Sequence, residues 1–465
     1  MAIEWSGWGP QLLLELDREA GTPLKSQVEQ HLRAAIRAGR LAAGERLPSS
    51  RALARHLGLS RGLIQECYAQ LQAEGYLTAH TGSATRVASA AAAPAPAARP
   101  QQREQEPALI ADFPSGVPDL RLAPRQDWAW AVAQVCRTAP NSAFDYGPAN
   151  GNPRLREVLA AYLRRVRAVD TYASQVLICT GVAQGLGLTL RVLAKRGHTR
   201  VAFENPGAVR TVKDAAAGAG IEPVPVGVDE DGIDVEALGR SGARIVVVTP
   251  AHQWPTGVVM APARRHALLA WARGNDGVVI EDDYDAEFRY DRDPVGALQG
   301  LAPDRVVSLG TVSKSLAPAL RLGWAVVPVS LVDDVMAEKM VADRGTSGID
   351  QLALAALIES GRYDRQLRRM RAVYARRRAV LMDAAPGRIT GLAAGFHAVL
   401  HLPASVGERE VVAAARARGV GVYGMSDYRA DGSRTPGRLV IGFGNTGEAA
   451  IESGMAVIAD LIQRV

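Results

Sequence analysis

The chain has 465 residues, of which 48% are hydrophobic and 22% charged, and its formal net charge is +6. This length is too great for one ordinary core, and the composition excludes an intrinsically disordered protein. The three cysteines are scattered and show neither a disulfide framework nor metal-ligand spacing. The first residues lack the pattern of a secretory signal, and no uncharged apolar stretch could span a bilayer. These features favour a cytoplasmic protein with two or three folding units and no bound metal.

Residues 88–110 separate two parts of the chain. This stretch is rich in Ala, Pro and Gln and shows no apolar periodicity. It cannot bury a core, and its composition is typical of a semi-extended linker. We therefore predict a front domain at residues 1–87, a linker at 88–110 and a back domain at 111–465.

The front domain is predicted to contain three helices and then two short strands. Apolar periodicity predicts helices over residues 24–38, 50–57 and 60–74, which Gly39, Gly58 and Gly75 are expected to end. The expected N-caps are Ser50 and Ser60. Two strand-like runs around a turn follow Gly75. The order of helix, turn, helix and hairpin is that of a winged helix-turn-helix.

Basic residues are concentrated in this domain. Residues 31–61 hold seven arginines against one glutamate, an excess equal to the net charge of the whole chain. A basic cluster on a compact helical unit is what contact with DNA phosphates requires. The alternative is a small helical interaction domain whose basic face is only solvated.

The back domain alternates apolar strands with helical patterns. The strand-like runs lie at residues 176–180, 201–204, 245–250, 278–283 and 306–311. This alternation predicts an α/β fold with a mostly parallel sheet and helices on both faces. Functional residues in such folds lie beyond the carboxyl ends of the strands. From about residue 379 a looser pattern predicts a smaller α+β subdomain.

A carboxylate lies at the end of one of these strands, and a lysine lies just past the next strand. Lys314 can form a Schiff base with the aldehyde of pyridoxal 5'-phosphate (PLP), and Asp282 can pair with the protonated pyridine nitrogen. The Tyr284 phenol can hydrogen-bond the ring oxygen. Hydroxyls and a guanidinium can hold the phosphate, and the candidates are Thr311, Ser313 and Arg321. The alternatives are a solvated lysine, a capping or ion-paired aspartate and a tyrosine packed in the core.

Residues 180–188 form a second candidate phosphate element. This glycine-containing turn follows a strand and opens a helix, where Gly181, Val182 and Ala183 would present backbone N–H groups to an anion. Such turns are common, so the element carries weight only because it precedes the Asp282 and Lys314 elements in the chain.

Residues 46–77 resemble the GntR family of regulators. The resemblance implies that Ser49, Ser50 and Arg51 contact the DNA backbone, and that the helix opening at Ser60 and Arg61 enters the major groove. Further DNA-binding candidates are Arg46, Gln65 and the hairpin glycine Gly82. Because Arg61 and Gln65 lie one turn apart at the start of that helix, both can reach base edges. The alternative for Gln65 is solvated surface.

Residues 146–157, 204–210, 247–257, 281–291 and 310–324 resemble fold-type I aminotransferases. They are more closely similar to the MocR/GabR family, in which such a domain is fused to a GntR head, and the match covers nearly the whole chain. The resemblance implies PLP on Lys314 and an amino-acid or amine ligand held by Arg438, with Arg210 as a second contact. It also implies a head-to-tail homodimer in which Tyr146 reaches a phosphate across the interface. Two heads would bind a double-stranded operator with repeated half-sites.

Two positions depart from the aminotransferase pattern. Ala208 stands where many relatives carry a tyrosine near the cofactor. Trp254 stands where aminotransferases carry an asparagine that contacts the ring oxygen, and His252 or Gln253 are the candidates to substitute for it. This loss favours sensing over turnover.

The sequence is compatible with three functions. The favoured one is a PLP-dependent, DNA-binding transcriptional regulator that senses PLP or an amine through a Lys314 Schiff base, with a weak transamination half-reaction left open. The alternative is a catalytically active aminotransferase with an accessory DNA-binding head. A third is a DNA-binding protein whose back domain only dimerises, which the presence of Lys314, Asp282 and Tyr284 disfavours.

Overall fold

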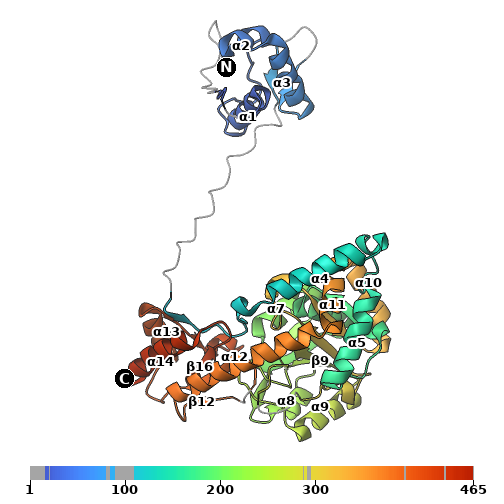
Figure 1. Cartoon of the computed structure of the whole chain (residues 1–465), viewed down its shortest axis with the longest axis vertical. Helices are drawn as coiled ribbons and strands as arrows, with labels where there is room; N and C mark the ends of the chain where they lie inside the picture. Colours follow the sequence, from blue (N-terminus) through green and yellow to red (C-terminus); the bar gives the residue numbers. More distant parts are fainter. Residues whose placement is uncertain are drawn as a thin grey trace. The chain divides into compact units, whose positions relative to one another are not determined.

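A computed structural model describes residues 16–19, 21–79, 84–88, 109–285, 287–290, 295–391, 394–433 and 436–463. The chain forms two compact units, Met1–Glu106 and Pro107–Val465 (Figure 1). The expected hairpin glycine Gly82 and most of the expected linker lie outside the described residues. In the described part, no helix combines the length and apolarity that a membrane span needs.

The front unit contains the predicted helices and hairpin. The elements are α1 (Leu24–Arg37), α2 (Ser50–Leu57), α3 (Arg61–Ala73), β1 (Leu77–Thr78) and β2 (Arg86–Val87), and β1 pairs with β2 antiparallel. Gly58 ends α2 in the left-handed conformation at φ 63°. Ser60 caps α3 as predicted, whereas the cap of α2 is Ser49 and not Ser50: the Ser49 hydroxyl accepts from the Ala52 N–H at 3.2 Å.

An eight-stranded sheet forms the centre of the back unit. Its strand order is β4-β11-β10-β9-β8-β5-β6-β7. The five predicted strands are confirmed as β4 (Val176–Cys179), β5 (Arg200–Asn205), β8 (Ile245–Val248), β9 (Val278–Asp283) and β10 (Val306–Thr311). Strands β5, β6, β8, β9 and β10 run parallel, and β4 has the same direction because β11 is antiparallel to both β4 and β10.

Three strands of this sheet were not predicted. They are β6 (Glu222–Asp229), β7 (Gly232–Ile233) and β11 (Gly323–Val326). Strand β6 contains Pro223 and Pro225, which a sequence pattern does not favour in a strand, and it lies near the sheet edge where proline is tolerated. Strand β11 reads Gly-Trp-Ala-Val, and its glycine and alanine weaken the apolar, β-branched run that marked the equally short β4 and β8.

Helices cover both faces of the sheet, as predicted. On one face, Val247 and Ile280 pack with the cluster around α6 (Val182–Lys195) and α7 (Val209–Ala219). On the other, Val246 and Val248 pack with α8 (Val235–Arg240) and α9 (Pro262–Gly274). The alternation of buried residues along β8 produces this division. Further helices of the unit are α4 (Arg125–Thr138), α5 (Pro153–Arg167), α10 (Val332–Asp343) and α11 (Gly348–Glu359).

The predicted C-terminal α+β subdomain follows the long helix α12 (Arg362–Ala384). Its sheet has the order β12-β13-β16-β15, with β12 (Ile389–Thr390), β13 (His397–His401), β16 (Arg438–Gly442) and β15 (Tyr423–Gly424), and its helices are α13 (Glu408–Ala417) and α14 (Glu448–Gln463). The first strand of the back unit, β3 (Ala111–Asp112), pairs in parallel with β14 (Val420–Gly421). The segment that enters the unit is therefore anchored on this subdomain, which carries the labels α13, α14 and β16 in Figure 1.

Candidate functional site

A cavity of about 350 Å³ opens beyond the carboxyl ends of β4, β9 and β10. Parallel direction places these ends at the same edge of the sheet, which is where open α/β sheets bind ligands. The cavity brings together many of the predicted residues, and its lining is Ser115, Gly116, Gly181, Val182, Ala183, Ala208, Thr211, Thr249, Trp254, Asp282, Tyr284, Thr311, Ser313, Lys314 and Arg321.

Lys314 lies three residues after β10, and its amine points to the segment that follows β3. The Lys314 Nζ donates a hydrogen bond to the Gly116 carbonyl at 2.6 Å. Burial lowers the pKa of Lys314, an effect that the nearby Asp282 and Asp285 oppose. A lowered pKa increases the neutral fraction of the amine, and the neutral amine is the nucleophile.

Asp282 is the last residue but one of β9 and lies beside the strand that precedes Lys314, since it pairs with Leu309 of β10. Burial and then the charge of Asp283 raise the pKa of its carboxyl to about 7, although Lys314 acts against both. Its Oδ1 is buried and has no hydrogen-bond partner among the residues that the structure describes. A buried oxygen of this kind is costly unless a donor supplies a hydrogen bond, so the position suits a cationic N–H group of a ligand.

One end of the cavity is suited to an anion. Gly181, at φ 130°, precedes the first turn of α6, and a Cβ built there would lie 3.5 Å from the Arg321 guanidinium. The Thr311 hydroxyl donates to the Ser313 hydroxyl at 2.8 Å. A helix N-terminus, a guanidinium and two hydroxyls at one place form a phosphate-binding arrangement.

Tyr284 and Trp254 form aromatic walls. The Tyr284 hydroxyl donates to the His252 carbonyl at 3.1 Å. The Trp254 indole N–H donates to the Ser115 hydroxyl at 3.3 Å, and its ring meets Tyr428 edge-to-face at 4.8 Å between centroids. Of the two candidates to replace the missing asparagine, Gln253 donates to Glu204 Oε2, Pro206 O and Trp254 O. His252 is 2% exposed and belongs to the layer behind Tyr284 rather than to the lining.

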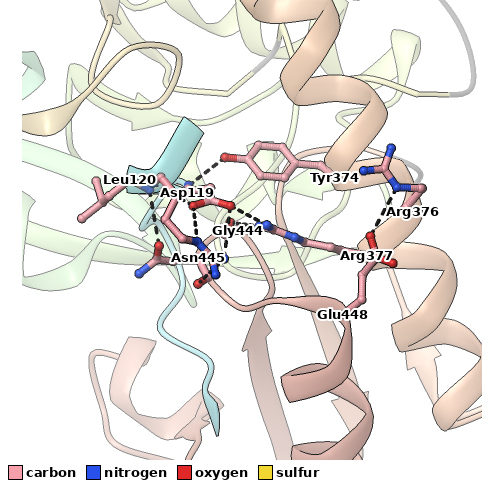
Figure 2. Close-up of polar contacts among 9 residues, drawn as sticks. Asp119, Leu120, Tyr374, Arg376, Arg377, Gly444, Asn445 and Glu448 are labelled. Carbon is pink, nitrogen blue, oxygen red and sulfur yellow. Dashed lines mark hydrogen bonds and ion pairs between the residues drawn. The ribbon is translucent and has the colours of Figure 1, made fainter. Parts of the chain in front are cut away.

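The segment that carries Gly116 continues into a polar cluster (Figure 2). The Asp119 carboxylate pairs with Arg377 of α12 and accepts from Arg121 Nε at 3.0 Å. The Asp119 N–H donates to the Tyr374 hydroxyl at 3.0 Å, and Arg377 also donates to the Gly444 carbonyl. The cluster therefore joins the segment over the lysine to α12 and to the loop before α14.

The other predicted ligand residues lie apart from this cavity. Arg438 opens β16, and its Nε is buried without a partner in the described part of the chain, while burial and Arg429 lower the pKa of its guanidinium. Arg210 is exposed on the first turn of α7, next to the cavity residue Thr211. Tyr146 is 80% exposed and lines a different cavity.

In the front unit, a hollow of about 530 Å³ lies between α2, α3 and the approach to β2. Four of the predicted DNA-binding residues line it, namely Arg46, Ser49, Ser50 and Gln65. Arg51, Ser60 and Arg61 are exposed at the starts of α2 and α3. One arginine of the basic cluster is not free for DNA, because Arg33 pairs with Glu74 at 2.6 Å and with Glu29 at 3.2 Å.

Comparison with known proteins identifies both parts of the chain. Residues 112–448 match the family described as aminotransferase class I and II, and residues 24–87 match the gntR family of bacterial regulatory proteins. The probable rhizopine catabolism regulatory protein MocR of Rhizobium meliloti is 35% identical over 80% of this chain and 78% of its own length. The pyridoxine biosynthesis transcriptional regulator PdxR of Corynebacterium glutamicum is 31% identical over 97% of this chain and 98% of its own. The chain belongs to the gntR-family regulators that carry an aminotransferase class I and II domain.

Solved aminotransferases share the fold of this regulator's back unit. An archaeal alanine:glyoxylate aminotransferase superposes with a TM-score of 0.69 at 26% identity, covering 77% of this chain and 91% of its own. The kynurenine aminotransferase of Pyrococcus horikoshii superposes with a TM-score of 0.70 at 23% identity, covering 78% of this chain and 95% of its own. The predicted fold class is confirmed, and the cofactor of such a domain is PLP.

The described residues of the regulator fit PLP. The unpartnered Asp282 Oδ1 can accept from a protonated pyridine nitrogen, and the Lys314 amine lies in the same cavity. The turn at Gly181 and the Arg321 guanidinium offer a place for the phosphate.

Sequence reasoning missed several residues of the regulator's site. Gly116 and Ser115 come from a segment without regular structure, and Asp285 and His397 lie in the layer behind Tyr284. Asp285 was within reach of a pattern argument because it follows β9 by two residues. Gly116 and His397 showed no signal, since only the tertiary fold brings them near the site.

Proposed function

We propose that this regulator binds operator DNA with its front unit and carries PLP on Lys314 in its back unit, and that an amino acid or amine reacting there changes its affinity for DNA. The observation that carries the proposal is the single cavity that joins Lys314, Asp282 and the phosphate-type elements, in a chain whose other unit is a basic winged helix-turn-helix. We propose that residues 1–87 form the DNA-binding domain, residues 88–110 the linker and residues 111–465 the PLP-binding domain.

The residues of the cavity have distinct roles in this proposal. Asp282 holds the proton on the pyridine nitrogen, Tyr284 donates to the ring oxygen, and Lys314 anchors the aldehyde carbon. Gly181, Val182, Ala183, Thr311, Ser313 and Arg321 hold the phosphate. The bound cofactor supplies an aldehyde that condenses reversibly with amines and a ring that withdraws electrons.

The carboxylate of an amino-acid effector would be bound by Arg438 or Arg210. The unpartnered Nε of Arg438 in the described structure supports its role, because a buried guanidinium N–H favours an anionic partner. The relatives are named as regulators of rhizopine catabolism and of pyridoxine biosynthesis, which supports small amines or the cofactor itself as the class of signal.

A homodimer with a head-to-tail arrangement in the cytoplasm completes the proposal. The 80% exposure of Tyr146 supports a role at a subunit interface, where it would reach the phosphate of the partner's cofactor. Two front units would bind two half-sites of a direct or inverted repeat. Ligand binding acts as a switch only if the two arrangements of the heads differ in ligand affinity.

A mobility-shift assay on the chain's own upstream DNA tests the proposal. The expected result is an affinity that changes with PLP or with one of a panel of amino acids, and a loss of this response in Lys314→Ala. Lys195→Ala is the matched control, because Lys195 is 72% exposed on α6. Binding that ignores the ligands and the Lys314 substitution would overturn the proposal.

The second candidate function is turnover as an aminotransferase. The presence of Asp282, Tyr284 and Lys314 in one cavity favours some residual chemistry, whereas Trp254 occupies the position of the usual asparagine. Assays with many amino donors and keto acids separate the two, since a regulator is expected to show at most a half-reaction and an aminotransferase repeated turnover.

A further inference from the structure

Three buried polar side chains lie behind the Tyr284 wall of the cavity. His252 follows β8, Asp285 follows β9 and His397 opens β13, and each is 2% exposed. The ligand-type atoms of the three residues lie within 4.8 Å of one another. Buried polar groups in such a cluster are costly unless they form defined hydrogen bonds, so the cluster requires an explanation.

The central contact is between His252 and Asp285. His252 Nδ1 lies 2.8 Å from Asp285 Oδ2. An ionised carboxylate can only accept, so we assign the His252 proton to Nδ1 in this pair. The same Nδ1 lies 3.3 Å from the Tyr284 hydroxyl oxygen, so its N–H is shared between the carboxylate and the phenol.

The Tyr284 hydroxyl has one proton, which it donates to the His252 carbonyl at 3.1 Å. A carbonyl can only accept, so this proton cannot be donated to a cofactor oxygen at the same time. As long as Nδ1 is a donor, it can hold the phenol oxygen while the phenol proton turns toward the cavity. If Nδ1 were an acceptor, it would attract the phenol proton away from the cavity.

The packing around the pair is close. Gly395 has φ 63°, and a Cβ added there would lie 2.3 Å from His252 Cε1 and 2.5 Å from Asp285 Oδ2. The His397 ring packs on the His252 ring with 4.6 Å between centroids. Burial lowers the pKa of His397 well below its ordinary value, and His252 lowers it further, so His397 stays neutral. Little room remains for His252 to move away from Tyr284.

We propose that His252 and Asp285 are positioning residues that hold Nδ1 of His252 as a donor and thereby direct the Tyr284 proton to the ring oxygen of the cofactor. This inference rests on the proposed function. It assigns to Asp285 a role that no motif assigns, and it gives His252 an indirect role in place of the direct cofactor contact that the sequence suggested. Asp282 on β9, Glu204 on β5 and Lys314 in the loop after β10 also face this region.

The Asp285→Asn variant is the sharpest perturbation. The side chain keeps its shape, but a neutral amide no longer fixes the proton on Nδ1, so the tautomer with its proton on Nε2 becomes accessible and leaves Nδ1 able to accept from the phenol. The phenol then gives its proton to Nδ1, and the ring oxygen loses a donor. A ring oxygen that bears more negative charge stabilises the proton on the nitrogen that links cofactor and lysine, so that nitrogen is expected to titrate about one pH unit higher.

The test is a pH titration of the visible absorbance of the PLP-loaded full chain. Tyr284→Phe is expected to raise the midpoint by about one pH unit, and Asp285→Asn to do the same. The double variant is expected to equal Tyr284→Phe alone, because Asp285 acts through the phenol. His252→Phe, which removes Nδ1 and keeps the carbonyl, provides the same readout if Asp285→Asn does not fold.

The matched control is His401→Phe, because His401 lies on the same strand β13 but contacts Thr390 outside this cluster, and the variant is expected to leave the midpoint unchanged. Additive shifts in the double variant, or an unchanged midpoint in both Asp285→Asn and His252→Phe, would overturn the inference while the wild-type spectrum still supported the proposed function. One metal ion per chain in the purified protein would also overturn it, since a metal would take the place of the Nδ1 proton. A wild-type protein without the visible band would refute both proposals.

Discussion

The Asp119–Arg377 pair in Figure 2 offers a stability test with an internal control. The Asp119 and Arg377 side chains are 2% and 7% exposed. Removing one partner of a buried pair costs about 3–5 kcal/mol. Because Arg121 still pairs with Asp119 at 3.0 Å, we expect Arg377→Met to lower the free energy of unfolding by the smaller value, about 3 kcal/mol.

The neighbouring residue on α12 is the matched control. Arg376 pairs with Glu448 at 3.3 Å, but the two side chains are 60% and 45% exposed. An exposed pair contributes little, so Arg376→Met is expected to change the free energy of unfolding by less than about 0.5 kcal/mol. Urea unfolding followed by tryptophan fluorescence, to which the buried Trp271 and Trp324 of this unit contribute, measures both variants.

The difference in stability between Arg377→Met and Arg376→Met should also depend on pH. Burial alone would raise the pKa of Asp119, but the hydrogen bonds from Arg121 and Arg377 outweigh it and hold the pKa below its ordinary value of 3.8. The contribution of the pair is therefore complete above that value and is lost as the pH falls through the lowered pKa. Equal stability of the two variants at neutral pH would refute the reasoning.

Three further predictions concern the cofactor site and the DNA surface. Because burial raises the pKa of Asp282 to about 7, ionising it in the cofactor-free protein costs up to about 4 kcal/mol. In urea titrations, the free energy of unfolding of Asp282→Asn should therefore increase relative to that of the wild type as the pH rises toward neutrality. The variant should also retain PLP less well. A stability difference that does not change with pH would contradict this prediction. Gln65→Ala is expected to cost about 1–3 kcal/mol on operator DNA and nothing on unrelated DNA in mobility shifts, and equal losses would remove Gln65 as a base reader. Arg46→Ala should weaken both complexes alike and lower the salt slope by about 1; an unchanged slope would show that Arg46 contacts no phosphate.

Local patterns predicted much of the framework. Continuous apolar runs marked the five buried parallel strands, and Gly58 and Ser60 marked the turn between α2 and α3. The candidate Asp282 lies near the end of β9 and Lys314 follows the adjacent parallel strand β10, so the sheet itself brings them to one edge. These features depend on short stretches of sequence or on a general rule of parallel sheets.

Local sequence patterns could not predict the contacts between segments that lie far apart in the chain. Asp119 and Arg377 are 258 residues apart, and Lys314 and Gly116 are 198 apart. The His252–Asp285 pair joins two loops, and nothing in either loop indicates that their side chains meet. The shift of the α2 cap from Ser50 to Ser49 is a smaller error, because adjacent serines offer the same hydroxyl.

The attachment of PLP to Lys314 is the claim on which the account depends most directly. Reduction of the PLP-loaded chain with borohydride, followed by peptide mass mapping, locates the attachment. We expect a pyridoxyl phosphate group on the Lys314 peptide and none on Lys25, Lys195, Lys213 or Lys339. An unmodified Lys314 peptide, or a group attached to one of the other lysines, would contradict it.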